Sequence, residues 1–198
     1  MLLRLLHFLA SKSSVYDAIQ WIVGASTVRQ EIQRHTGVCA GAKTVLDLGG
    51  GTGALRAYLP TDCHYICLDV EIPKLRGFRG AYPLGSALLA DATQLPVPPD
   101  SVDVVLCVAM SHHVDDVQFN LILKEVQRVV KKGGLFLFLD AVSAPRRLLS
   151  RLLWSLDRGS HPRERDIIEG FIQRHFNLLH REVFSIYHSY LLIAAQRR

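Results

Sequence analysis

The chain has 198 residues, of which 49% are hydrophobic and 21% are charged, with a formal net charge of +5. This length allows one domain with a large core, and it excludes a nucleotide-binding domain followed by a separate catalytic domain. The composition excludes a disordered chain, and four cysteines without a Cys-x-x-Cys pair argue against a disulfide scaffold. We interpret these cysteines as reduced packing residues of a cytoplasmic protein.

Residues 1–36 carry apolar side chains at helical spacing, which predicts one or two helices. We expect this segment to form a helical cap that packs on the domain or covers its site, with peripheral membrane contact as the alternative. The apolar stretch 2–10 is interrupted by Arg4 and His7 and reaches only about half a membrane span. It therefore predicts neither a transmembrane helix nor a signal peptide.

Residues 44–53 read as the end of a buried strand followed by Gly49, Gly50, Gly51 and Gly53. Glycines allow a sharp turn and a close approach of a ligand to the backbone, so we expect a cofactor loop. The spacing of Gly49, Gly51 and Ala54 also fits a loose dinucleotide fingerprint. Asp47 argues against that interpretation, because its carboxylate would repel a pyrophosphate and would attract a cationic ligand.

Helix-like and strand-like segments alternate after this loop, which predicts right-handed crossovers and a mostly parallel sheet with ligands at the carboxyl ends of its strands. A short helix through Leu59 should end at Pro60, and Lys131 to Gly134 should give the helix before it a left-handed glycine cap. The predicted strands are 64–69, 86–90, 102–108, 135–139, 176–184 and 187–195, and the predicted helices lie within 71–85 and at 116–130, 146–156 and 163–174.

The motif Asp47-x-Gly49-x-Gly51-x-Gly53 resembles the first motif of the class I S-adenosylmethionine-dependent methyltransferases. The resemblance continues in order and spacing through Asp69, Asp91 and Met110-Ser111-His112-His113, and it covers about residues 40–198. It implies S-adenosyl-L-methionine as cofactor. It also implies an α/β fold of Rossmann-like, doubly wound type, in which a mostly parallel seven-stranded sheet has an antiparallel strand near the C-terminal edge. We assign residues 37–198 to this domain and 141–162 to a predicted substrate lid.

The strand ends supply the predicted cofactor contacts. Asp69 is placed to accept hydrogen bonds from two ribose hydroxyls, with a helix N-cap as the alternative role. The resemblance implies that Asp91 accepts from the adenine amino group beside Ala92, unless it only forms a turn before Thr93, and that Asp47 acts on the methionine amino group, unless it only supports the loop. The full predicted set is Asp47, Gly49, Gly50, Gly51, Gly53, Asp69, Val70, Asp91, Ala92 and Met110.

Two histidines follow the strand 102–108, above the expected methyl position. His113 and His112 are the candidates for a general base, if the acceptor must lose a proton, and pocket-wall residues otherwise. Tyr187, His188 and His161 are further candidates at the rim. We predict no metal, because Asp140 lacks a matching cluster of acids.

The predicted function is transfer of a methyl group to oxygen, nitrogen or carbon of a small or lipophilic metabolite. The leucines and aromatics of 1–36 and 141–162 favour a hydrophobic acceptor, unless they only pack the core. An RNA or protein methyltransferase is an alternative, although the basic C-terminal third contains no RNA-binding module, which makes a nucleic-acid partner unlikely on this pattern. A catalytically inactive cofactor-binding protein and an NAD-dependent oxidoreductase are the others.

Overall fold

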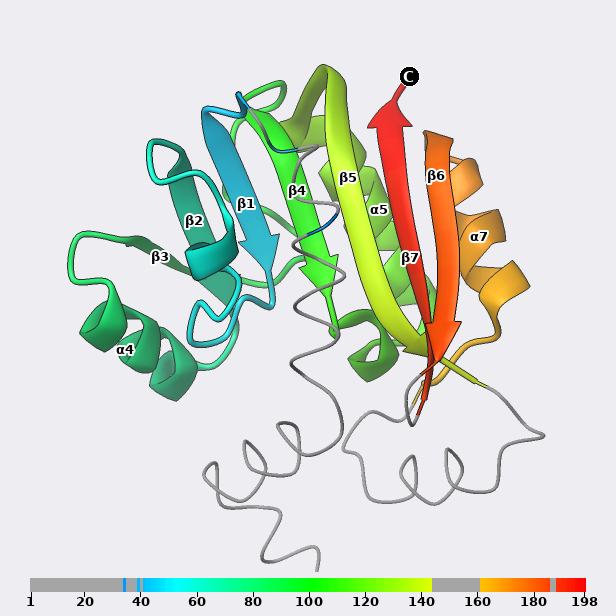
Figure 1. Ribbon diagram of the computed structural model, residues 1–198, viewed down its shortest axis with the longest axis horizontal. Coiled ribbons are helices and arrows are strands. Elements are labelled where there is room, and N and C mark those ends of the chain that lie inside the picture. The colour runs from blue at the N-terminus through cyan, green and yellow to red at the C-terminus, as the bar shows by residue number, and fades with distance from the viewer. Residues whose placement is uncertain (1–33, 35–38, 40, 144–160, 186–187) are drawn as a thin grey trace, which may run out of the picture.

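The computed structural model describes residues 34, 39, 41–143, 161–185 and 188–198. Within them, seven strands form one sheet in the order β3-β2-β1-β4-β5-β7-β6 (Figure 1). The predicted N-terminal helices, the helix 146–156 and most of the predicted lid lie outside the described residues. The strands are β1 (Thr44–Leu48), β2 (His64–Asp69), β3 (Ser86–Leu89), β4 (Val102–Val108), β5 (Val130–Val142), β6 (Phe176–Ser185) and β7 (Ser189–Arg197).

Strands β1 to β5 pair in parallel, whereas β7 runs antiparallel to both of its neighbours, β5 and β6. The α/β fold class and the antiparallel strand near the C-terminal edge are therefore confirmed. Parallel pairing aligns the carboxyl ends of β1, β2, β4 and β5 along one edge, seen at the arrowheads in Figure 1. We call this the carboxyl edge.

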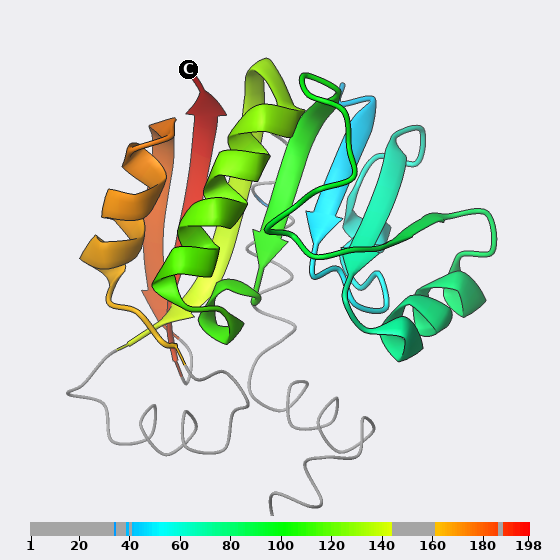
Figure 2. The same ribbon diagram turned by 180° about the vertical axis from the view of Figure 1, so that it is seen from behind.

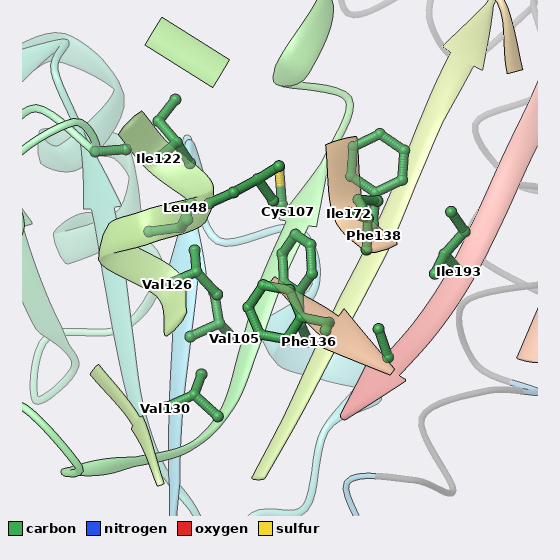
Figure 3. Close-up of a cluster of buried hydrophobic side chains, with 14 of the residues drawn as sticks. Leu48, Val105, Cys107, Ile122, Val126, Val130, Phe136, Phe138, Ile172 and Ile193 are labelled. Atoms are coloured by element: carbon green, nitrogen blue, oxygen red, sulfur yellow. The ribbon is translucent and has the colours of Figure 1, made fainter. Parts of the chain in front are cut away.

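Helices α5 (Asp116–Val129) and α7 (Arg165–Gln173) cover one face of the sheet (Figure 2). Helix α5 begins at a capping box, in which Asp115 and Gln118 each accept from the other's backbone N–H. Its apolar stripe packs on β4 and β5 around Phe136 and Phe138 (Figure 3). Helix α4 (Ile72–Ala81) follows β2 at the carboxyl edge. The four cysteines are buried among apolar side chains, as predicted.

The predicted helix after the glycine loop is wrong, because only a 3₁₀ turn, η2 (Arg56–Tyr58), forms there. Gly51 and Gly53 have φ angles of 58° and 78°, which no α-helix accommodates. The stretch that remains before Pro60 is too short to nucleate a helix.

The predicted glycine cap of α5 is also wrong. The helix ends at Val129, and Val130 is already extended as the first residue of β5. Gly133, with φ 75°, lies in a bulge of β5 between the pairs Val102–Val130 and Val104–Leu135. Lys131 binds Asp103 Oδ1 at 2.6 Å instead of neutralising the helix terminus. Among the described residues, no helix is long and apolar enough to cross a membrane.

Candidate functional site

The glycine loop joins three strand ends at the carboxyl edge. Gly50 N–H donates to the Leu68 carbonyl at 3.0 Å, and Gly51 N–H donates to Asp69 Oδ2 at 3.1 Å, so the loop is tied to the end of β2. A Cβ on Gly49 would lie 2.8 Å from Met110 Cγ, so the turn after β4 touches the same loop. The structure therefore brings together the predicted residues of β1, β2 and β4.

Two glycines of this loop have different neighbours. A Cβ on Gly53 would overlap the Phe78 ring of α4, so this glycine serves the packing of the protein itself. A Cβ on Gly51 would meet nothing closer than Lys74 Cδ at 3.8 Å. The open space over a left-handed backbone at Gly51 is a cradle that a ligand could fill.

Asp69 is buried at the end of β2, where Oδ1 accepts from Glu71 N at 2.9 Å. The residue at the N-cap of α4 is Glu71, so the alternative cap role of Asp69 does not apply. A carboxylate has about four acceptor positions, which leaves capacity for ligand hydroxyls beside the two backbone bonds. Next to it, Val70 is 65% exposed, an apolar surface at the site itself.

Asp47 is buried near the end of β1, and the Tyr65 hydroxyl donates to its Oδ2. Desolvation raises the pKa of Asp47, the hydrogen bond from Tyr65 partly offsets this rise, and the nearby charge of Asp69 adds to it. Together these effects bring the pKa to about 7. A ligand ammonium would favour the ionised form. The sequence analysis missed Tyr65, although its position on the neighbouring strand, two residues before the partner of Asp47, could have indicated it.

Asp91 and Ala92 follow β3. Asp91 is exposed, and its Oδ1 accepts from both the N–H and the hydroxyl of Thr93, each at 2.8 Å. The turn role considered for Asp91 is thus present, and it does not conflict with a ligand contact through the other oxygen. Ala92 is buried.

The turn after β4 separates the two candidate bases. Ala109, which precedes it, has a φ of 51°, an uncommon value for a residue with a Cβ and one often found near functional sites. Met110 leads into the 3₁₀ turn η3 (Ser111–His113). His112 is buried at 6% exposure, whereas His113 is exposed, and their rings lie 4.1 Å apart.

Asp140 of β5 lies under this turn with 1% exposure and accepts four hydrogen bonds. His112 Nδ1 lies 2.6 Å from Oδ1, and the Ser111 hydroxyl donates to Oδ2 at 2.5 Å. The backbone N–H groups of Ala141 and His112 donate at 2.8 and 3.2 Å. Burial would raise the pKa of Asp140, but the charge of His112 and these hydrogen bonds lower it below its usual range. Asp140 is therefore a buried carboxylate anion.

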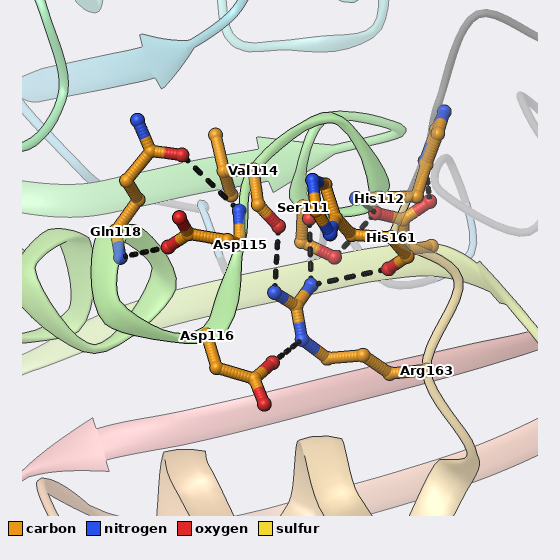
Figure 4. A network of polar contacts seen from close by, with 9 residues as sticks. Ser111, His112, Val114, Asp115, Asp116, Gln118, His161 and Arg163 are labelled. Atoms are coloured by element: carbon orange, nitrogen blue, oxygen red, sulfur yellow. Dashed lines mark hydrogen bonds and ion pairs between the residues drawn. The ribbon is translucent and has the colours of Figure 1, made fainter.

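Arg163 clamps the same turn from the segment before α7 (Figure 4). Its Nη1 donates to the Ser111 carbonyl at 2.7 Å, and Nη2 donates to the Val114 carbonyl at 2.6 Å. Nε binds Asp116 Oδ1 at 2.7 Å, and the guanidinium lies 4.9 Å from the centre of the Phe119 ring. We call these contacts the Arg163 clamp.

Of the three residues predicted at the rim of the site, the structure describes His161 and His188. His161 donates its backbone N–H to the His112 carbonyl at 3.0 Å, while its own side chain is exposed. His188 is buried with its ring edge-on to Tyr190, and Tyr187 lies outside the described residues. In the described parts of the chain, no group of three or more His, Cys, Asp or Glu side chains could hold a metal ion.

The strand order defines a doubly wound, Rossmann-like domain, a fold class whose ligands lie at the carboxyl ends of the strands, where the cradle at Gly51 and the acids are found. A family model described as "Methyltransferase domain" matches residues 46–138. The structure of a geranyl diphosphate methyltransferase in complex with S-adenosylmethionine superposes with a TM-score of 0.72 at 14% identity, covering 87% of this chain and 85% of that one.

Two curated relatives carry named activities. The thiol S-methyltransferase TMT1B of Rattus norvegicus is 33% identical over 127 residues, covering 56% of this chain and 47% of the relative. The fatty-acid O-methyltransferase of Mycolicibacterium smegmatis is 33% identical over 122 residues, covering 57% and 44%. The chain spans 38 to 56% of the length of such curated relatives. The chain belongs to the class I S-adenosylmethionine-dependent methyltransferases.

Proposed function

We propose that this protein transfers the methyl group of S-adenosylmethionine to a small, lipophilic acceptor. The observation that carries this proposal is the convergence of the cradle at Gly51, the buried Asp69 and the Met110 turn at one edge of the sheet. When bound there, the cofactor supplies an electrophilic methyl group on a sulfonium. The protein then has to align the acceptor and exclude water.

The residues present fit this cofactor in charge and shape. Asp69 would accept from the ribose hydroxyls, with Val70 against the adenine and Asp91 and Ala92 at its far side. Asp47 would face the ammonium of the methionine moiety, since a cation stabilises the ionised form of a buried carboxylate. Glycines 49, 50, 51 and 53 would let the ligand lie directly on the backbone.

The acceptor class is supported by the named relatives, of which one acts on thiols and one on fatty acids. Both names denote transfer to a sulfur or oxygen atom, and neither names a nucleic acid as the acceptor. We also propose a reducing, cytoplasmic location, supported by the buried cysteine thiols. A catalytically inactive cofactor-binding protein and an RNA or protein methyltransferase remain the alternatives.

Thermal unfolding with S-adenosylmethionine, S-adenosylhomocysteine or NAD tests the proposal. A ligand at 100 times its dissociation constant stabilises the fold by about 2.7 kcal/mol. The first two ligands should raise the melting temperature of the wild type but not of Gly51→Val. Stabilisation by NAD alone, or by none of the three, would refute the proposal. Binding without methyl transfer to thiol, hydroxyl, carboxylate or amine acceptors would favour the inactive alternative.

A further inference from the structure

We propose that helix α4 and the turn after it, residues 72–85, bind the surface of an anionic lipid membrane. We call these residues the α4 surface. The inference goes beyond the proposed function and does not depend on it. It rests on the charge of this stretch, on the aliphatic side chains that it exposes, and on the contacts that hold its turn in place.

The α4 surface is basic along its whole length. Residues 72–85 contain Lys74, Arg76 and Arg79 and no aspartate or glutamate. Glu71, just before the helix, forms an exposed ion pair with Lys74 at 2.7 Å, so the two arginines remain as the excess charge. Both arginines are exposed. A surface of this sign attracts an anionic partner.

Exposed aliphatic side chains accompany these cations. Ile72 precedes Arg76 by four positions and Arg79 by seven, a spacing that places all three along one side of α4. Ile72 is 49% exposed, and Leu84, in the turn after the helix, is 99% exposed. Aliphatic side chains beside cations are typical of surfaces that enter the boundary between lipid headgroups and acyl chains.

The protein's own contacts fix the turn that carries Leu84. Gly85 N–H donates to the Tyr82 carbonyl at 2.9 Å, and the Arg79 guanidinium donates to the Gly85 carbonyl. A Cβ on Gly85 would lie 2.5 Å from Phe78 Cζ, so the turn packs directly on that buried ring. An ordered turn thus holds Leu84 in solvent, one residue from the carbonyl that Arg79 binds.

The position of the α4 surface relates it to the carboxyl edge. Helix α4 begins three residues after Asp69, the last residue of β2. Figures 1 and 2 show the helix at the β3 end of the sheet, far from α5 and α7. A membrane bound here would lie beside the edge at which we propose that a lipophilic acceptor is methylated.

The composition of the α4 surface favours a lipid over a nucleic acid. Single-stranded nucleic acids are held by aromatic side chains on which their bases stack. The two aromatic side chains of this stretch pack within the protein, because Phe78 is buried and the half-buried Tyr82 ring lies 5.4 Å from it. Ile72 and Leu84 cannot stack on a base, but they can insert between lipid headgroups.

Sedimentation of the 198-residue chain with vesicles tests the proposal. The chain should bind vesicles that contain one-third phosphatidylserine at least about tenfold more tightly than vesicles of phosphatidylcholine alone. Arg76→Gln should weaken binding about fivefold, the effect of one cation at an anionic leaflet. Leu84→Ser should weaken it about tenfold, because an apolar side chain no longer leaves water. Lys74 stays unchanged, since its side chain lies nearest the cradle at Gly51.

Matched control variants change the same kinds of side chain on α5. Lys124→Gln removes an exposed cation, and Val117→Ser removes an aliphatic side chain that is 71% exposed. Because neither residue belongs to the α4 surface, both variants should bind anionic vesicles within about twofold of the wild type. The four substitutions lie at exposed positions, and equal melting temperatures will show that each variant is folded.

A fluorescent label locates the contact. The four native cysteines are buried, so a thiol-reactive environment-sensitive dye should react at position 84 of Leu84→Cys. Its emission should shift to the blue when anionic vesicles are added, because the dye then leaves water. The same dye on Val117→Cys should show no shift.

The outcomes separate this inference from the alternatives. Equal binding to both kinds of vesicle would overturn it. So would binding that neither Arg76→Gln nor Leu84→Ser weakens, together with an unshifted label at position 84. Arg76→Gln that weakens binding of a short single-stranded RNA but not of vesicles would assign the surface to nucleic acid instead. All these measurements omit S-adenosylmethionine, so the proposed function stands or fails separately, by the thermal unfolding test above.

Discussion

The carboxyl edge has two halves that are built in different ways. In the half to which we assign the cofactor, β1 and the loop after it contact β2 over 18 positions of sequence: Gly51 N–H donates to Asp69, and the Tyr65 hydroxyl donates to Asp47. In the acceptor half, His112 reaches Asp140 over 28 positions, and Arg163 reaches Ser111 over 52. The first half leaves open space over the backbone, whereas the second is filled by buried hydrogen bonds.

Under the proposed function, cofactor binding and methyl transfer depend on separate parts of the carboxyl edge. The cradle depends on the absence of side chains at the glycines, so adding one should impair cofactor binding. The turn at His112 depends on polar partners from β5 and from the segment before α7, so removing one should impair turnover or stability. Changes in one half should leave the other half largely intact.

The largest effect is expected for Gly51→Val. A β-branched side chain would fill the cradle and would strain a backbone held at φ 58°. We expect about a hundredfold weaker binding of S-adenosylhomocysteine, near the upper end of the about 1–3 kcal/mol that an intruding side chain costs. Calorimetric titration measures this. Gly80→Val is the control, because a Cβ there meets nothing within 4 Å, and normal affinity in Gly51→Val would remove the loop from the site.

A smaller effect, on stability rather than binding, is expected for Arg163→Ala. The carbonyls of Ser111 and Val114 would each lose a donor, at a cost of roughly 1–3 kcal/mol per unsatisfied buried group. Urea unfolding should show this loss, while S-adenosylhomocysteine affinity stays within about threefold. Asp166→Ala removes an exposed ion pair with Arg165 and should leave the midpoint nearly unchanged. A clamp variant with wild-type stability would contradict this role.

The smallest effect concerns pH and Asp47, whose folded pKa is raised to about 7. Between about pH 4 and 7 the folded protein keeps a proton that the unfolded chain, with an aspartate pKa of about 3.9, has released. The stability contributed by this group is therefore lost as the pH rises through that window. The decrease in melting temperature from pH 5 to pH 7.5 should be smaller in Asp47→Asn than in the wild type. An identical fall in both proteins would show that Asp47 ionises normally.

The sequence predicts the strands of the first half well because the information for them is local. Continuous apolar runs gave strands β1, β2 and β4 within a residue or two, since a buried parallel strand needs apolar side chains on both faces. The glycines predicted the sharp turn of the loop, and the apolar run before Asp69 predicted its position at the end of a strand. The helix after the loop was mispredicted because positive φ angles at Gly51 and Gly53 are a property of the folded loop.

The acceptor half could not be predicted in the same way. Asp140 looked like an unaccompanied acid, because its partners Ser111 and His112 come from another strand end. Nothing in the sequence distinguished His112 from His113, since only the fold buries one and exposes the other. Arg163 belongs to the basic C-terminal third, and no sequence pattern indicates that it is buried against Phe119. Long-range hydrogen bonds leave no periodic pattern in the chain.

The most direct test of the central claim, that the two halves are separable and that the first holds the cofactor, is the dissociation constant of S-adenosylhomocysteine in three proteins. Loss of charge-assisted hydrogen bonds worth about 1.5–3 kcal/mol should weaken binding at least about tenfold in Asp69→Ala. Asp140→Asn should bind within about threefold of the wild type. Unchanged affinity in a folded Asp69→Ala protein, or equal weakening in both variants, would contradict the account.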